Sequence, residues 1–157
     1  TSVSVLKKYL NKKFLLFILL PLIIGFISYL LGGSTDLFSE INKPSFAPPK
    51  ILFPIVWTIL YILMGISSYI IYEKKDKNNS LKVYLLNLLV NMLWTPIFFR
   101  FKWFLLSFIW IIILDIIVII MIMRFNKISK VASYIQIPYL IWIIFASVLN
   151  LSIYLLN

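Results

Sequence analysis

Five long apolar segments, separated by short clusters of lysine and arginine, limit most strongly how this chain can fold. Each segment is roughly 18–25 residues long, which as an α-helix matches the ~30 Å hydrocarbon thickness of a bilayer. Transmembrane β-barrels instead use alternating segments of about 10 residues. The pattern therefore predicts an all-α integral membrane protein, a single domain built as a bundle of five transmembrane helices. We expect the spans at about residues 14–31, 51–72, 81–99, 103–123 and 131–156.

Composition supports a membrane protein and excludes several kinds of site. Hydrophobic residues make up 62% of the chain and charged residues 13%, whereas a soluble domain is about 45–50% apolar. There is no Cys and no His, so disulfides, imidazole acid–base chemistry and the usual zinc ligands are excluded. With five acidic residues, we expect no metal site and no two-carboxylate hydrolase. The net charge of +10 fits lysines facing anionic lipid headgroups better than nucleic-acid binding.

The distribution of basic residues predicts an orientation. Eleven of the 15 Lys and Arg residues fall before the first span, between the second and third (counting Lys82 at the entry of the third), and between the fourth and fifth. The other four are Lys43, Lys50, Arg100 and Lys102. Because cytoplasmic loops are enriched in Lys and Arg, we expect a cytoplasmic N-terminus and an external C-terminus. The short chain and its Lys-rich flanks favour a bacterial plasma membrane.

The connector between the first two spans, about residues 32–50, is the longest and has an unusual composition. Pro44, Pro48 and Pro49 fix φ near −65° and hold their neighbours extended. Phe38 and Phe46 are not expected to stay in water. We interpret the connector as an ordered cover over one end of the bundle; the alternative is a rigid spacer.

Three spans each present a face that mixes aromatic, small and amide side chains at helical spacing. Polar residues inside a membrane indicate function by default, and facing one another these helices would line a cavity for a flat apolar ligand. The alternatives are bonds between helices and an interfacial aromatic belt. The faces are Trp57, Tyr61, Met64 and Ser68; Asn87, Asn91, Trp94, Thr95 and Phe98; and Tyr139, Trp142, Ala146 and Asn150.

Four further residues lie inside spans. Pro21, Pro96 and Pro138 each remove a backbone donor and are expected to bend their helices, either opening a pocket or being tolerated by neighbours. Asp115 lies about midway along the fourth span, where it could pair across a helix interface or be protonated. A lone carboxylate does not make a catalytic dyad.

Three motifs occur in an order that resembles one known family. They are KPSFAPP followed by FPIVWTILYILMG, then LNLLVNMLWTPIFF, then IPYLIWIIFASVLNLSIYLLN. Together they resemble the translocator protein family, also called tryptophan-rich sensory proteins or peripheral-type benzodiazepine receptors. The likeness covers essentially the whole chain.

The resemblance implies a five-helix bundle, commonly a homodimer, whose first connector is a lid over a pocket. It implies binding of porphyrins such as protoporphyrin IX or a haem-like tetrapyrrole as ligand, with no cofactor and no metal required. Trp57 and Trp142 match the family's pocket tryptophans, and they would be the catalytic residues if light- and oxygen-dependent protoporphyrin degradation occurs. The full set of expected ligand-binding residues is Phe38, Phe46, Pro48, Trp57, Tyr61, Asn87, Asn91, Trp94, Tyr139, Trp142, Ala146 and Asn150.

Three departures from the family pattern qualify these expectations. The C-terminal sterol pattern ends in Lys or Arg, whereas here Tyr154 is followed by Leu155, Leu156 and Asn157. A family Asp aligns with Trp110, and Phe46 stands where Trp is common. The residues favour a tetrapyrrole-binding receptor, with oxidative degradation as the alternative. A transporter has less support, because no inverted repeat is visible.

Overall fold

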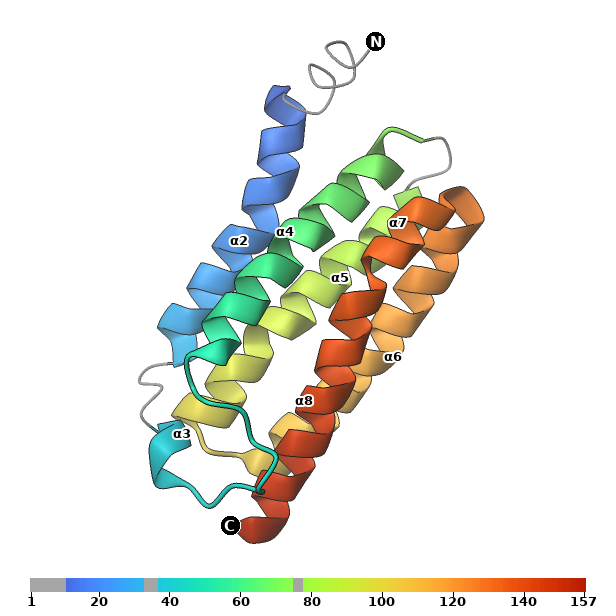
Figure 1. Cartoon of the computed structure of the whole chain (residues 1–157). Helices are drawn as coiled ribbons and strands as arrows, with labels where there is room; N and C mark the ends of the chain where they lie inside the picture. Colours follow the sequence, from blue (N-terminus) through green and yellow to red (C-terminus); the bar gives the residue numbers. More distant parts are fainter. Residues whose placement is uncertain (1–10, 33–36, 75–77) are drawn as a thin grey trace.

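The structure is a computed structural model that describes residues 11–32, 37–74 and 78–157. In the described part of the chain, five helical rods are long and apolar enough to cross a membrane, and they run along the length of the molecule (Figure 1). This confirms the predicted all-α, five-span architecture. The rods are α2 Lys12–Gly32, α4 Leu52–Tyr72, α5 Asn78–Thr95 with its extension η1 Pro96–Arg100, α6 Phe104–Ile128, and α7 Lys130–Ile135 followed by α8 Ile137–Leu156.

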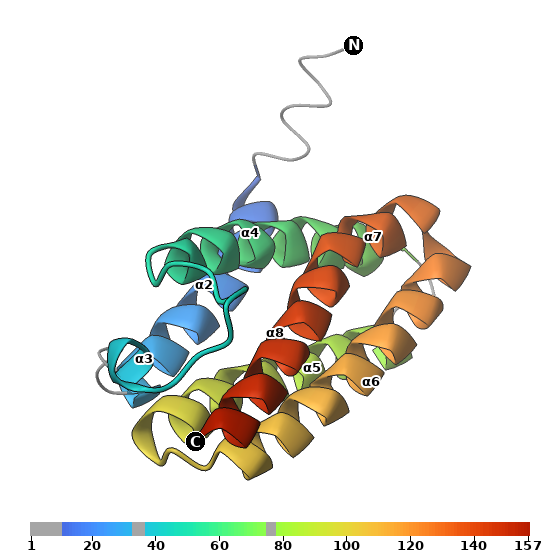
Figure 2. The same ribbon diagram turned by 60° about the horizontal axis from the view of Figure 1, so that its bottom comes forward.

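The helices pack in a ring that is incomplete at one end. Helix α2 lies against α4 and α5, α5 against α6, and α6 against α8, while α7 closes the ring onto α4. Helices α4 and α8 then diverge towards the end where the connector lies, as Figure 2 shows.

Two prolines account for irregularities in the helices. Pro138 lies in the first turn of α8 and cannot donate a backbone hydrogen bond, so the predicted fifth span is interrupted at Gln136. Pro96 begins the π-helical turn η1, in which the backbone N–H of Phe101 donates to the carbonyl of Pro96 over 3.0 Å. Pro21 is accommodated inside α2.

Small polar side chains face inwards, whereas many Leu and Ile side chains face outwards. Two of the buried hydroxyls donate to backbone carbonyls of neighbouring helices: Ser28 to Met92 over 2.9 Å and Ser67 to Ala132 over 2.7 Å. This is the arrangement expected in lipid, which solvates apolar surface and leaves internal bonds to satisfy polar groups.

The described part of the connector, from residue 37 onward, lies across one end of the bundle (Figure 1). It begins with the short helix α3, Leu37–Glu40. Lys43 Nζ donates to the carbonyl of Phe38 over 2.6 Å. The backbone N–H of Asn42 donates to the side chain of Asn157 over 3.2 Å, and Asn157 Nδ2 donates back to the Asn42 carbonyl over 2.8 Å. The connector is therefore fastened to the C-terminal end of α8.

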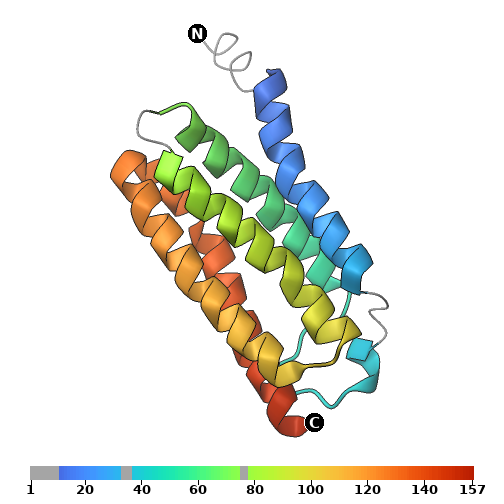
Figure 3. The same cartoon turned by 180° about the vertical axis from the view of Figure 1, so that it is seen from behind.

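The described basic residues are divided between the two ends of the bundle. Figure 3 shows the start of α2, the end of α4 and the α6–α7 junction at the end opposite the connector. These segments carry six of the eleven described Lys and Arg residues: Lys12, Lys13, Lys74, Arg124, Lys127 and Lys130. Four others used to predict the orientation, Lys7, Lys8, Lys75 and Lys77, lie outside the described residues.

Candidate ligand-binding site

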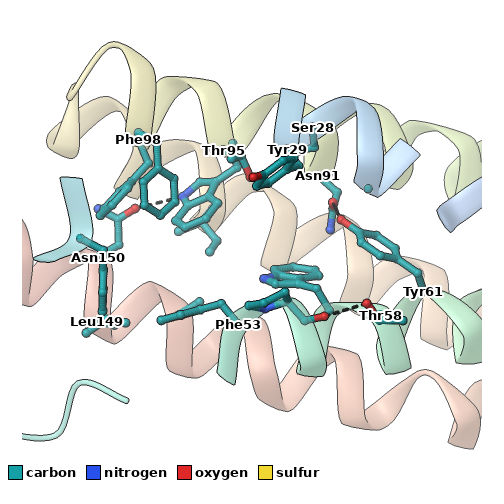
Figure 4. Close-up of a pocket in the computed structure, with 18 of the residues that line it drawn as sticks. Ser28, Tyr29, Phe53, Thr58, Tyr61, Asn91, Thr95, Phe98, Leu149 and Asn150 are labelled. Carbon is teal, nitrogen blue, oxygen red and sulfur yellow. Dashed lines mark hydrogen bonds between the residues drawn. The ribbon is translucent and has the colours of Figure 1, made fainter. Parts of the chain in front are cut away.

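A cavity of about 810 Å³ lies beneath the connector, between α2, α4, α5 and α8. This volume is within the range of small-molecule sites, roughly 300–1,000 Å³. In Figure 4, the labelled side chains of α4, including Phe53 and Thr58, lie across the cavity from Thr95 of α5 and Phe98 of η1. The faces of α4 and of α5 with η1 therefore form two opposite walls of the cavity, and α2 and α8 contribute to the rest of its lining.

Aromatic rings form much of this wall. Trp57 stacks on Tyr61 with ring centroids 5.5 Å apart and planes 27° from parallel. Trp94 stacks on Phe98 at 5.2 Å and 26°. Two stacked pairs, one on α4 and one spanning the end of α5 and η1, offer planar surface to a flat guest.

A chain of hydrogen bonds supports the wall from behind. Tyr61 Oη donates to Asn91 Oδ1 over 2.7 Å, and Asn91 Nδ2 donates to Tyr139 Oη over 2.8 Å. Tyr139 Oη in turn donates to Asn87 Oδ1 over 2.6 Å. Tyr61 and Asn91 line the cavity, whereas Asn87 and Tyr139 are buried behind it. The deeper pair can thus hold the lining pair in place.

Asn150 fixes a second part of the wall. Its Oδ1 accepts a hydrogen bond from Trp94 Nε1 over 3.0 Å, and its Nδ2 donates to the carbonyl of Phe104 over 2.9 Å. The indole of Trp94 is therefore held against α8 at a position where it lines the cavity.

The structure brings seven of the expected binding residues into the cavity lining: Phe38, Trp57, Tyr61, Asn91, Trp94, Ala146 and Asn150. It places the other five elsewhere: Asn87 and Tyr139 behind the wall, and Phe46, Pro48 and Trp142 outside the lining.

Trp142 lies in the seam between α4 and α8. Its ring centroid is 5.8 Å from that of Phe53 and 5.6 Å from that of Phe145. Phe46 of the connector packs on Phe145 at 6.2 Å. These rings pack between α4 and α8 where the two helices diverge. Trp142 therefore closes the side of the site and does not line its interior.

Sequence reasoning missed the contribution of α2. Gly25, Phe26, Ser28 and Tyr29 line the cavity, but α2 is apolar on all sides and its sequence distinguishes no inward face. Ser28 was the available signal, as a hydroxyl within an apolar span. Asp115 lies outside the lining, with its Oδ2 2.7 Å from Ser147 Oγ.

Comparison with known proteins gives this geometry a family. The TspO/MBR family model matches residues 17–156. The chain belongs to the TspO/MBR family. Its relatives in the TspO/MBR family include a tryptophan-rich protein TspO of Archaeoglobus fulgidus, 42% identical over 89% of this chain and 94% of the relative.

Two further TspO/MBR relatives have different names. A tryptophan-rich sensory protein of Cereibacter sphaeroides is 31% identical over 76% of each chain. A translocator protein of Ovis aries is 28% identical, covering 85% of this chain and 83% of its own. Membership in the TspO/MBR family confirms the resemblance drawn from the three motifs. It makes the protein an integral membrane protein and supports a receptor-type role.

Proposed function

We propose that this protein is a membrane receptor that binds porphyrins, with protoporphyrin IX as the representative ligand, in the cavity under the connector. The observation that carries the proposal is the aromatic lining, in which Trp57–Tyr61 and Trp94–Phe98 form stacked pairs on two helices. A planar macrocycle can stack on such faces, and the few polar groups at the wall can orient it. The name of the Cereibacter relative, a sensory protein, is consistent with a binding role.

A fluorescence titration tests the proposal. Protoporphyrin IX added to the purified protein should quench tryptophan emission to a saturating level. Trp57→Ala should weaken binding by roughly 10-fold, about 1.4 kcal/mol, because it removes a stacking face. Trp103→Ala is the matched control, since Trp103 is 55% exposed and outside the lining. Equal effects of the two substitutions, or no saturable quenching, would refute the proposed site.

Trp142 provides a second comparison in the same titration. Because this indole lies in the seam and outside the lining, we expect Trp142→Ala to weaken binding less than Trp57→Ala does. A larger loss at Trp142 would mean that the ligand occupies the seam between α4 and α8 instead.

Light- and oxygen-dependent degradation of protoporphyrin is the second candidate function. The placement of Trp57 in the cavity wall favours it, because an indole in contact with a photoexcited porphyrin could take part in oxidation. Illumination in air, compared with illumination without oxygen, should then give a new absorbing product that Trp57→Phe suppresses. Quenching with unchanged pigment would leave binding alone.

We also propose a homodimer in a bacterial plasma membrane with a cytoplasmic N-terminus. The dimer rests on what the family resemblance implies, and the orientation rests on the distribution of Lys and Arg. Cross-linking in native membranes tests the dimer: a band at twice the 18.5 kDa chain mass should form at low cross-linker concentration.

A further inference from the structure

The described residues that line the cavity differ in exposure from one side of it to the other. On α5, η1, α6 and α8 every lining residue is buried or half-buried. The exposed members are confined to the second half of α2 and the start of α4, and they are Phe26, Tyr29, Ile51, Pro54 and Thr58. The cavity is therefore closed towards α5, α6 and α8 and open where α2 faces the start of α4.

Two close contacts hold the first part of α2 against α4. A Cβ placed on Gly65 of α4 would lie 2.7 Å from the Cα of Ile18, so the two backbones nearly touch there. Seven residues further along α2, Gly25 makes room for the ring of Tyr61. Both contacts precede Phe26 along α2, so they lie farther from the connector than the exposed lining residues do.

Beyond Gly25 the contacts of α2 pass from α4 to α5. Ser28 Oγ donates to the carbonyl of Met92 over 2.9 Å. Gly32 faces Thr95, since a Cβ placed on Gly32 would lie 2.6 Å from Thr95 Cγ2. Helix α2 also contacts η1, and Figure 2 shows the end of α2 turned towards that segment. Helix α2 therefore crosses from α4 towards α5 as it approaches the connector.

This crossing leaves the first turns of α4 uncovered on the side of α2. Phe26 and Tyr29 share a face of α2, and Pro54 and Thr58 share a face of α4. Phe26 is 62% exposed and Tyr29 is 57% exposed, although both line the cavity. Tyr29 and Thr58 lie on opposite sides of the cavity (Figure 4). We call the gap bordered by Phe26, Tyr29, Pro54 and Thr58 the lateral opening.

The lateral opening lies within the membrane-spanning part of the bundle. Phe26 is six residues from the end of α2, and Thr58 is six residues from the start of α4, about 9 Å along each helix. Both helices are long and apolar enough to cross a membrane. Thr58 Oγ1 donates to the carbonyl of Pro54 over 2.7 Å, so this hydroxyl does not need water. The opening therefore faces hydrocarbon.

The connector covers the other way into the cavity. Asn42 and Asn157 exchange two hydrogen bonds that tie the connector to the end of α8. The buried ring of Phe38 packs on Phe53 of α4 with centroids 5.0 Å apart. A ligand that entered at this end would have to break these contacts, whereas the lateral opening requires none of them to break.

We infer that the ligand enters and leaves the cavity from the hydrocarbon layer, through the lateral opening, while the connector stays in place. This inference rests on the proposed porphyrin-binding function and adds the route by which the ligand arrives. Protoporphyrin IX is flat and mostly apolar, so it can partition into a bilayer before it binds. The protein would then draw its ligand from the membrane and not from water.

Cysteine chemistry can obstruct each route separately, because the chain contains no cysteine. Thr58→Cys in lipid nanodiscs is labelled with benzyl methanethiosulfonate, which adds a ring at the lateral opening. Stopped-flow quenching of tryptophan emission by protoporphyrin IX gives the rates. We expect the label to slow association about tenfold, within the range found among variants of one site. Dissociation should slow as well, because an obstruction hinders both directions, whereas the loss of a binding contact speeds dissociation.

Two controls separate the routes. Ile59→Cys carries the same label on the same helix, and because Ile59 is 53% exposed and outside the lining, neither rate should change. A disulfide between Asn42→Cys and Asn157→Cys locks the connector to α8 and should leave association as fast as in the reduced form. Removal of the label from Thr58→Cys with reductant should restore its rates, which also shows that the labelled protein was folded.

The possible failures can be told apart. If the label on Thr58→Cys leaves both rates unchanged or speeds dissociation, the lateral route is refuted, while saturable quenching still supports the proposed function. If the disulfide slows association about tenfold, the ligand enters past the connector and the inference is overturned. If protoporphyrin IX gives no saturable quenching of the unlabelled protein, the proposed function fails and the inference fails with it.

Discussion

At the scale of single residues, Asn91 does most to connect the candidate site to the bundle. Its amide has an acceptor and a donor, and it uses them on the hydroxyls of Tyr61 and Tyr139. One side chain of α5 thus joins α4 to α8. A leucine of similar size could fill the space but could make neither bond.

Replacing Asn91 with Leu should lower stability by about 1 kcal/mol, because two hydrogen bonds of roughly 0.6 kcal/mol each are lost within the membrane. Tyr61→Phe removes one of them and should cost about half as much. Thermal unfolding in detergent measures both, with Thr58→Val as a control, since Thr58 is exposed and bonds only within its own helix. In a double-mutant cycle, additive effects of Asn91→Leu and Tyr61→Phe would show that their bond contributes nothing.

At the scale of elements, the contact between α2 and α4 depends on the absence of a side chain at Gly65. A Cβ placed there would lie 2.7 Å from the Cα of Ile18 and 2.7 Å from the carbonyl oxygen of Phe17. Both atoms belong to the backbone of α2, so neither can move without moving the helix. Because α2 also forms one wall of the cavity, this close approach sets the width of the site.

Gly65→Ala should therefore push α2 away from α4. We expect a loss of stability of roughly 1–3 kcal/mol, as for other overpacked positions, together with weaker porphyrin binding. Ile59→Ala is a suitable control on the same helix, because Ile59 is 53% exposed and outside the lining. Unfolding temperatures and titrations of the two variants should differ clearly; similar values would mean that α2 shifts without cost.

The rigidity of the connector between α2 and α4 should favour ligand binding. Pro48 and Pro49 restrict it next to the start of α4, and Asn42 fastens its middle to the end of α8. A restricted cover loses little entropy when a ligand is enclosed.

Replacing Pro48 and Pro49 together with Ala should loosen the connector in the free protein. Each proline contributes about 0.4–1 kcal/mol through restriction of the chain. Because the loosened connector would have to become ordered when the ligand binds, affinity should fall by roughly 4- to 30-fold. Titration with protoporphyrin IX measures the affinity, and proteolysis of the connector should become faster. An unchanged affinity with faster proteolysis would show that the cover plays no part in binding.

At the scale of the whole molecule, the sequence predicts which residues share a helix face better than it predicts how far along the bundle the cavity lies. The five spans follow from bilayer thickness, and the structure reproduces them to within a few residues. Tyr139 and Asn150 belong to one predicted face, yet eleven residues of helix separate them by about 16 Å. The cavity lies in the half of the bundle nearer the connector, so Asn150 lines it and Tyr139 does not. That position depends on where α4 and α8 diverge, which no local pattern encodes.

The orientation in the membrane can be tested because the chain contains no cysteine. Ser45 lies exposed in the connector, and Lys127 lies exposed at the far end of α6. With a cytoplasmic N-terminus, Ser45→Cys should react with a membrane-impermeant maleimide in intact cells, and Lys127→Cys should react only after permeabilisation. The reverse pattern would overturn the orientation predicted from Lys and Arg and would place the connector on the cytoplasmic side. The predicted pattern would mean that the connector end of the cavity faces away from the cytoplasm, so a ligand made inside the cell would have to enter the bilayer or cross it before binding.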